Sequence, residues 1–271
     1  MKSYDKLMRW LLRWSWQYLA CAAAVLVLWD LIAVLSVGGA VENAYLSYDQ
    51  VLQAAHLEYP FVLAVTLACV LLALRYYSLV EEDGVKPVYG MMSLPAPRWA
   101  LPAAELGVAA LFVLALFALQ NLTALACYPA WRHAAAEAAA QFPAYAGNLA
   151  AAETVTGPFP PVGQADGLYL AFVRTPLLRV TLPGTLLELA TSAALAVLLA
   201  GCTAYGASHG SRFGLLFTVL IPAVTYGVCV QAAAVAEFFW SLLPVPVLLL
   251  LWAAWLSAST VLRYVRTFNL P

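Results

Sequence analysis

Three polar side chains lie within long apolar stretches of the sequence: Asp30, Glu105 and Gln120. Ionisable and polar side chains are costly in lipid, so they usually face the interior of a helix bundle or a water-filled path. Asp30 falls near the middle of its stretch and is the best candidate for an inward-facing polar site. Glu105 lies about two helical turns beyond Arg98 on one face, which favours a position near the membrane boundary. These three residues are the candidates for a polar path through the bundle.

Other chemistries lack the residues they need. The sequence has no G-x-x-x-x-G-K-[ST] motif, and its lysines are Lys2, Lys6 and Lys86, so ATP hydrolysis by the P-loop route is excluded for this chain. The five cysteines contain no C-x-x-C pair and no histidines lie at metal-ligand spacing from them, which favours small core residues. We therefore predict no catalytic residue, no metal and no cofactor bound by this chain.

The composition of the 271-residue chain indicates a membrane protein. Hydrophobic residues make up 64% and charged residues 10%, against about 45–50% and about 25% in soluble globular proteins. The few charged side chains are too few to cover so much apolar surface in water. A net charge of −1 gives no indication of nucleic-acid binding. We predict an all-α polytopic membrane protein.

Six apolar stretches approach the length of about 20 residues that a bilayer-crossing helix requires. Helices are favoured because each segment must satisfy its own backbone hydrogen bonds in lipid. Glu188 and Glu237 lie near the predicted outer ends of two of these stretches, where water is available, and need no special role. The predicted spans are 18–38, 60–80, 100–127, 184–205, 214–236 and 240–262.

The distribution of basic residues predicts the orientation. Lysine and arginine accumulate on the cytoplasmic side of membrane proteins. A cytoplasmic N-terminus with six spans places ten of the 13 lysines and arginines inside. An even number of spans also returns the chain to the side on which it began. We therefore predict that both termini are cytoplasmic.

Residues 1–17 have the pattern of an amphipathic interfacial helix. Plotted at 100° per residue, Lys2, Lys6, Arg9 and Arg13 gather on one face, while tryptophan, tyrosine and leucine occupy another. Basic residues opposite tryptophan and leucine are typical of a helix in the headgroup region. The predicted membrane-interface residues are Arg9, Trp10, Arg13 and Trp14.

The connections on the two sides of the bundle differ in character. The predicted cytoplasmic segment 81–98 runs from an acidic cluster to a Leu94-Pro95-x-x-Arg98 turn, in which the prolines prevent a continuous helix. The predicted extracytoplasmic segment 128–183 contains an alanine-rich stretch, Trp131–Ala152, that favours a surface helix. Its apolar part, 168–182, is interrupted by Pro176 and is too short and too charged to span comfortably. We expect this part to lie along the interface or to re-enter the membrane. Two roles for the extracytoplasmic segment remain open, an outer cap that gates an exit path and a passive loop.

The chain resembles the permease subunits of ABC-2 type ABC transporters. The resemblance rests on the N-terminal amphipathic helix, on the six-span layout with both ends inside, and on the acidic-Gly…Ser-Leu-Pro-x-x-Arg segment. In that family a short helix in this loop couples to the ATPase subunit. The chain departs from the family at Glu105, where a lysine is common, and in its long segment between spans three and four. The resemblance implies ATPase-coupling residues in this loop: Glu81, Glu82, Lys86, Tyr89, Ser93, Leu94, Pro95 and Arg98.

The resemblance implies a function for the whole chain. It implies the membrane-spanning permease of an ATP-driven exporter, with ATP and Mg on a separate cytoplasmic ATPase and a second permease copy or paralogue as partner. The apolar spans favour an amphipathic or apolar cargo moved by alternating access, and the location implied is the bacterial inner membrane. An ATP-independent secondary carrier or channel is the alternative, and a membrane enzyme or a structural assembly protein remains open.

Overall fold

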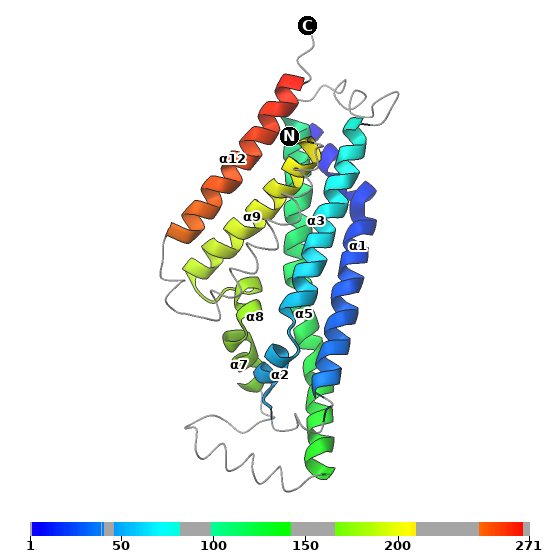
Figure 1. The fold of residues 1–271 in the computed structure, drawn as a ribbon, viewed down its shortest axis with the longest axis vertical. Helices are drawn as coiled ribbons and strands as arrows, with labels where there is room; N and C mark the ends of the chain where they lie inside the picture. The colour runs from blue at the N-terminus through cyan, green and yellow to red at the C-terminus, as the bar shows by residue number, and fades with distance from the viewer. Residues whose placement is uncertain are drawn as a thin grey trace.

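The computed structural model describes residues 2–38, 40, 46–81, 99–141, 166–209 and 244–267. All the regular secondary structure in these residues is helical. Among the described residues, four long helices and a fifth near the C-terminus pack as a bundle, and three short helices lie toward one end of it (Figure 1). The helices are α1 (Lys2–Gly38), α2 (Tyr48–Ala54), α3 (Glu58–Glu81), α5 (Ala100–Gln141), α7 (Asp166–Arg174), α8 (Pro176–Thr181), α9 (Leu186–His209) and α12 (Pro244–Thr267).

Four helices among the described residues are long and apolar enough to cross a membrane. They contain the candidate spans Tyr4–Gly38, Glu58–Ser78, Ala100–Ala134 and Glu188–Ser208. These match the predicted spans one to four and confirm an all-helical, multi-pass arrangement. α12 contributes a shorter apolar stretch, Val247–Arg263, where span six is predicted. Span five, predicted over 214–236, lies outside the described residues.

The structure places no helix boundary at residue 17. A single helix of 37 residues covers both the predicted interfacial segment and the first span. No glycine or proline interrupts this part of the sequence, so nothing ends the helix between them. Leu7 and Leu11 of its first turns are buried in one cluster with side chains of α3, α5 and α9. The apolar arc that predicted a lipid contact therefore includes residues that contact protein.

The first turns of α1 are inclined to α5. Tyr4 donates to the carbonyl of Ala103 at 3.4 Å, and Asp30 is hydrogen-bonded to Gln120. Between these contacts α1 advances 26 residues, about 39 Å, whereas α5 advances 17 residues, about 26 Å. The excess length of α1 requires it to cross α5 obliquely at this end (Figure 1). A position of these turns in the headgroup region stays a prediction.

α5 continues well beyond the predicted end of span three. It has 42 residues and contains Pro129 within the helix, which gives a length of about 63 Å. The predicted extracytoplasmic segment 128–183 therefore begins inside a helix, and the surface helix predicted over 131–152 is an extension of α5 as far as Gln141. Trp131, predicted on a surface helix, is buried. Alanine-rich sequence after Pro129 has high helix propensity and carries the helix on.

The long helices share a common arrangement of ends (Figure 1). α1 and α5 begin, and α3, α9 and α12 end, at one end of the molecule, which we call the terminal end. α2, α7 and α8 lie toward the other end and pack together, and we call these three helices the cap. α9 and α12 are neighbours and run in the same direction. α12 therefore begins at the end opposite to that where α9 stops, as the predicted fifth span requires.

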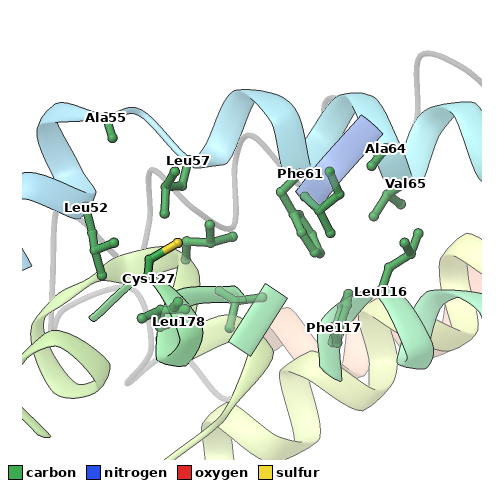
Figure 2. Close-up of a cluster of buried hydrophobic side chains, with 14 of the residues drawn as sticks. Leu52, Ala55, Leu57, Phe61, Ala64, Val65, Leu116, Phe117, Cys127 and Leu178 are labelled. Carbon is green, nitrogen blue, oxygen red and sulfur yellow. The ribbon is translucent and has the colours of Figure 1, made fainter. Parts of the chain in front are cut away.

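A buried apolar cluster joins the cap to the spanning helices. Figure 2 shows Leu52 of α2 and Leu178 of α8 together with side chains of α3 and α5. Phe61 and Phe117 pack with ring centroids 5.7 Å apart, and both are buried. The cap thus shares one hydrophobic core with α1, α3, α5 and α9.

Candidate functional site

Asp30 and Gln120, two of the three predicted polar-path residues, form a hydrogen-bonded pair. Gln120 Nε2 donates to Asp30 Oδ2 at 2.8 Å. The pair links α1 to α5 and is buried, with 1% of Asp30 and 0% of Gln120 exposed. Because the two positions are 90 residues apart, the sequence held no signal for their pairing. The structure thus brings together two residues that were selected only for their polarity.

The cap lies close to this pair through Tyr48 of α2. The Tyr48 hydroxyl donates to the carbonyl of Ala124, one turn beyond Gln120 on α5. The centroid of its ring lies 5.1 Å from the ring centroid of Tyr128 and 5.2 Å from that of Trp131. Burial raises the pKa of the Tyr48 phenol far above its usual range, so Tyr48 remains a neutral donor. Three aromatic rings therefore close the cap side of the Asp30–Gln120 pair.

Glu105, the third predicted polar-path residue, belongs to a separate cluster. It is 0% exposed, so the expected position at the membrane boundary does not leave it in contact with water. It lies near Tyr76 of α3, whose hydroxyl is also close to Ser15 of α1. Fifteen residues of α5, about 22 Å, separate Glu105 from Gln120. The three candidates thus form two buried polar sites rather than one.

Of the four predicted membrane-interface residues, the two arginines are exposed and the two tryptophans make ring contacts. Arg9 and Arg13 are exposed, and Arg9 forms an ion pair with Asp5 at 3.0 Å. Trp14 is half-buried and carries the Arg75 guanidinium over its ring, 3.4 Å from the centroid. Trp10 stacks on Trp14 with centroids 5.3 Å apart. Trp14 is therefore a contact between α1 and α3 rather than a lipid anchor alone.

Two arginines of the cap form ion pairs. Arg174, at the end of α7, lies 3.8 Å from Asp49 of α2 and is 41% exposed. Arg179 of α8 donates to Glu188 of α9 from Nε at 3.1 Å and from Nη2 at 2.5 Å. The first pair closes α7 onto α2, and the second fixes α8 to the start of the fourth span. Segment 168–182 is thus two short helices broken at Thr175, and neither is long enough to cross a membrane.

Glu188 has a structural role that the sequence analysis did not assign. It was expected to sit in water at the outer end of its span, but it is 4% exposed. Besides Arg179, it accepts hydrogen bonds from the backbone N–H groups of Gly184 and Thr185, at 2.9 and 3.2 Å. Its carboxylate therefore caps the first turn of α9, where unpaired N–H groups favour a negative charge.

Sequence reasoning missed α2, which carries both Tyr48 and Asp49. Ser47 donates its backbone N–H to Gln50 Oε1 at 3.1 Å, the arrangement of a capping box. The Ser-x-x-Gln spacing at 47–50 was the available signal for a helix start. At seven residues the helix is too short to produce a clear periodic pattern.

The predicted ATPase-coupling residues lie almost entirely outside the described residues. Glu81 is the last residue of α3. The structure gives no contacts for the rest of the predicted coupling set: Glu82, Lys86, Tyr89, Ser93, Leu94, Pro95 and Arg98.

The fold and the spans define the chain as a helical, multi-pass membrane protein. Searches with protein-family models, against curated proteins and against solved structures give no match. Among the described residues no group of three or more histidine, cysteine, aspartate or glutamate side chains is placed to hold a metal ion.

Proposed function

We propose that this chain is the membrane-spanning permease subunit of an ATP-driven exporter of the ABC-2 type. It pairs with a second copy or a paralogue, and a separate cytoplasmic subunit binds ATP and Mg and hydrolyses the nucleotide. The cargo is amphipathic or apolar and moves by alternating access. The membrane is the bacterial inner membrane, with both termini of the chain in the cytoplasm.

The observation that carries this proposal is the position of the two helix ends that flank the segment 82–98. α3 ends at Glu81 and α5 begins at Ala100, both at the terminal end (Figure 1). Tyr76 of α3 and Leu101 of α5 belong to one buried cluster, so both helix ends are held in the bundle. A short connection between two packed helices can transmit a displacement from an attached subunit to the spans.

Contacts at the terminal end support this route for coupling. α1 reaches the same cluster through Leu7 and Leu11, and Arg75 of α3 lies over Trp14 of α1. A displacement of the segment 82–98 would therefore act on α1, α3 and α5 together. The polar sites at Asp30 and Glu105 both lie on these three helices.

An ATP-independent secondary carrier is the second candidate, and one observation favours it. A proton-coupled carrier uses two or more buried carboxylates in its spans. The sequence clearly offered only Asp30, but Glu105 is also fully buried within a candidate span. Among the described residues, Asp30 and Glu105 are therefore both buried carboxyl groups of the kind that such a carrier requires.

Purification of the tagged protein in mild detergent, followed by identification of co-purifying proteins, tests the proposal. We expect a soluble ATPase that is lost when Glu81 and Glu82 are both changed to lysine. The matched control is Glu137→Lys, a charge reversal at an exposed site on the far part of α5. Undiminished ATPase binding in the double variant would refute the assignment of the coupling segment to residues 81–98. Transport by vesicles that contain no ATP would favour the carrier.

A further inference from the structure

The Asp30–Gln120 pair contains two oxygen atoms without a hydrogen-bond donor. Asp30 Oδ1 and Gln120 Oε1 are buried and have no partner among the described residues. A buried acceptor without a donor has lost its hydrogen bonds to water without replacement, and this loss is greater for a charged acceptor. The pair already has one hydrogen bond, and a single hydrogen atom between its two remaining oxygens would supply the missing donor.

We propose that this pair is a proton-binding site, in which Asp30 Oδ1 carries a proton and its O–H group donates a hydrogen bond to Gln120 Oε1. A carboxylic acid and a primary amide have complementary donors and acceptors. The amide N–H donates to one carboxyl oxygen, and the carboxyl O–H donates to the amide oxygen. The observed bond from Nε2 to Oδ2 is the first half of this arrangement. The two unpartnered atoms are the two that form its second half, so one proton satisfies both.

The position of the pair along the two helices gives it an apolar surrounding. Leu26 and Val34, one turn before and one turn after Asp30, are buried, as are Leu116 and Ala124 on either side of Gln120. Residues four apart share one helix face. The site thus has a carboxyl group, an amide and hydrocarbon neighbours, which is an environment that disfavours a free negative charge.

Among the residues that the structure describes, the titratable groups around Asp30 supply no positive charge. Cys127 and Tyr128 come from α5 and Tyr48 from α2, and from α3 the same buried cluster includes apolar side chains and the Cys69 thiol. These groups are uncharged near neutral pH. The ion pairs of the described residues involve other carboxylates, those of Asp5, Asp49, Glu58, Glu137 and Glu188. A proton is therefore the counter-charge that this site can hold.

Binding of the proton stabilises the contact between α1 and α5. A proton held by the folded protein and not by the unfolded chain makes the free energy of unfolding fall as pH rises. Loss of the proton would leave a buried carboxylate that repels the Gln120 carbonyl oxygen. The site thereby links the protonation of one side chain to the packing of two spans. It is independent of the ATPase, and so of the proposed export function.

Infrared difference spectroscopy of the protein in lipid nanodiscs tests the proposal directly. At about pH 7 we expect a carbonyl band of a protonated carboxyl group that is present in the wild type and lost in Asp30→Asn. Gln120→Leu removes its hydrogen-bond acceptor and should shift the band to higher frequency. Asp49→Asn is the control, because the Asp49 carboxyl group faces the Arg174 guanidinium instead of an amide. The band should persist in this variant and in Glu105→Gln.

The contrary results are equally defined. A folded Asp30→Asn protein whose spectrum lacks only a carboxylate band, not a protonated carboxyl band, would overturn the proposal. A carboxylate band that shifts on addition of sodium chloride, against choline chloride, would instead assign the site to an alkali cation and would also overturn it. If Asp30→Asn does not fold, wild-type protein labelled with ¹³C at its aspartate carboxyl groups replaces it. The absence of a labelled, protonated carboxyl band there would refute the site.

Discussion

The ion pair between Arg179 and Glu188 gives the sharpest test of the cap. We predict that Arg179→Ala lowers the free energy of unfolding by about 2–3 kcal/mol. The Glu188 side chain is 5% exposed and that of Arg179 is 30% exposed, so solvent screens their interaction only in part. Removal of the arginine leaves Glu188 Oε1 buried without its two guanidinium donors. The predicted loss of unfolding free energy is smaller than the loss of about 3–5 kcal/mol for breaking a fully buried ion pair. The reason is that Glu188 Oε2 keeps its hydrogen bonds from the backbone N–H groups of Gly184 and Thr185.

Arg174→Ala is the matched control for this prediction. Arg174 ends the neighbouring helix and also faces a buried carboxylate, but it is 41% exposed and 3.8 Å from Asp49. Such an exposed, long contact contributes about 0–1 kcal/mol. The assay is reversible unfolding in mixed micelles, followed by tryptophan fluorescence and by circular dichroism. A further variant, Arg179→Ala with Glu188→Gln, should recover part of the loss because the unpaired charge is removed. If the free energies of unfolding of Arg179→Ala and Arg174→Ala agree within about 0.5 kcal/mol, Arg179 does not fix the cap to the fourth span.

Two further predictions concern side chains packed at the cap and between the spans. Tyr48→Phe should lower the free energy of unfolding by about 1 kcal/mol, because it removes only the hydrogen bond to Ala124. Tyr48→Ala should lower it by about 3–5 kcal/mol, because packing is also lost. The same unfolding assay separates the two variants, and equal losses would contradict the aromatic contact. Gly38→Ala should destabilise by about 1–3 kcal/mol, because its Cβ would lie 3.0 Å from Trp131 Cδ1. Gly201→Ala meets its neighbours at 3.5 Å or more and should be tolerated, so a larger loss at this glycine than at Gly38 would contradict the packing.

Hydropathy predicted the first four spans because lipid imposes a simple requirement on length and polarity. The predicted spans 60–80 and 184–205 agree with α3 and α9 to within a few residues. Helix ends outside the hydrocarbon follow other rules. Span three was predicted to end at 127, but α5 continues through Pro129. A proline within a spanning helix is tolerated where neighbours or water satisfy the freed backbone group. The alanines that follow then extend α5 to Gln141.

The candidate site was predictable in its residues but not in its contacts. Asp30, Glu105 and Gln120 were selected because each is polar within an apolar stretch. Their separation into two clusters depends on how α1, α3 and α5 pack, which hydropathy does not encode. Similarly, an amphipathic arc predicts that Leu11 avoids water, but it does not tell lipid from protein as the neighbour. Packing of α1 against α5 decided that question in favour of protein.

The length of α5 has a consequence for the depth of the Asp30–Gln120 pair. Trp99, which precedes α5, is 54% exposed, and tryptophan is enriched where the bilayer meets water. With Trp99 at one boundary, Gln120 lies about 30 Å along the helix, which is about the full thickness of the hydrocarbon layer. Asp30 then sits at the far boundary, not midway through the bilayer as the centre of its apolar stretch suggested. The two buried carboxyl groups would then lie at different depths, with Asp30 nearer to the side of the cap and Glu105 nearer to the opposite side of the bilayer.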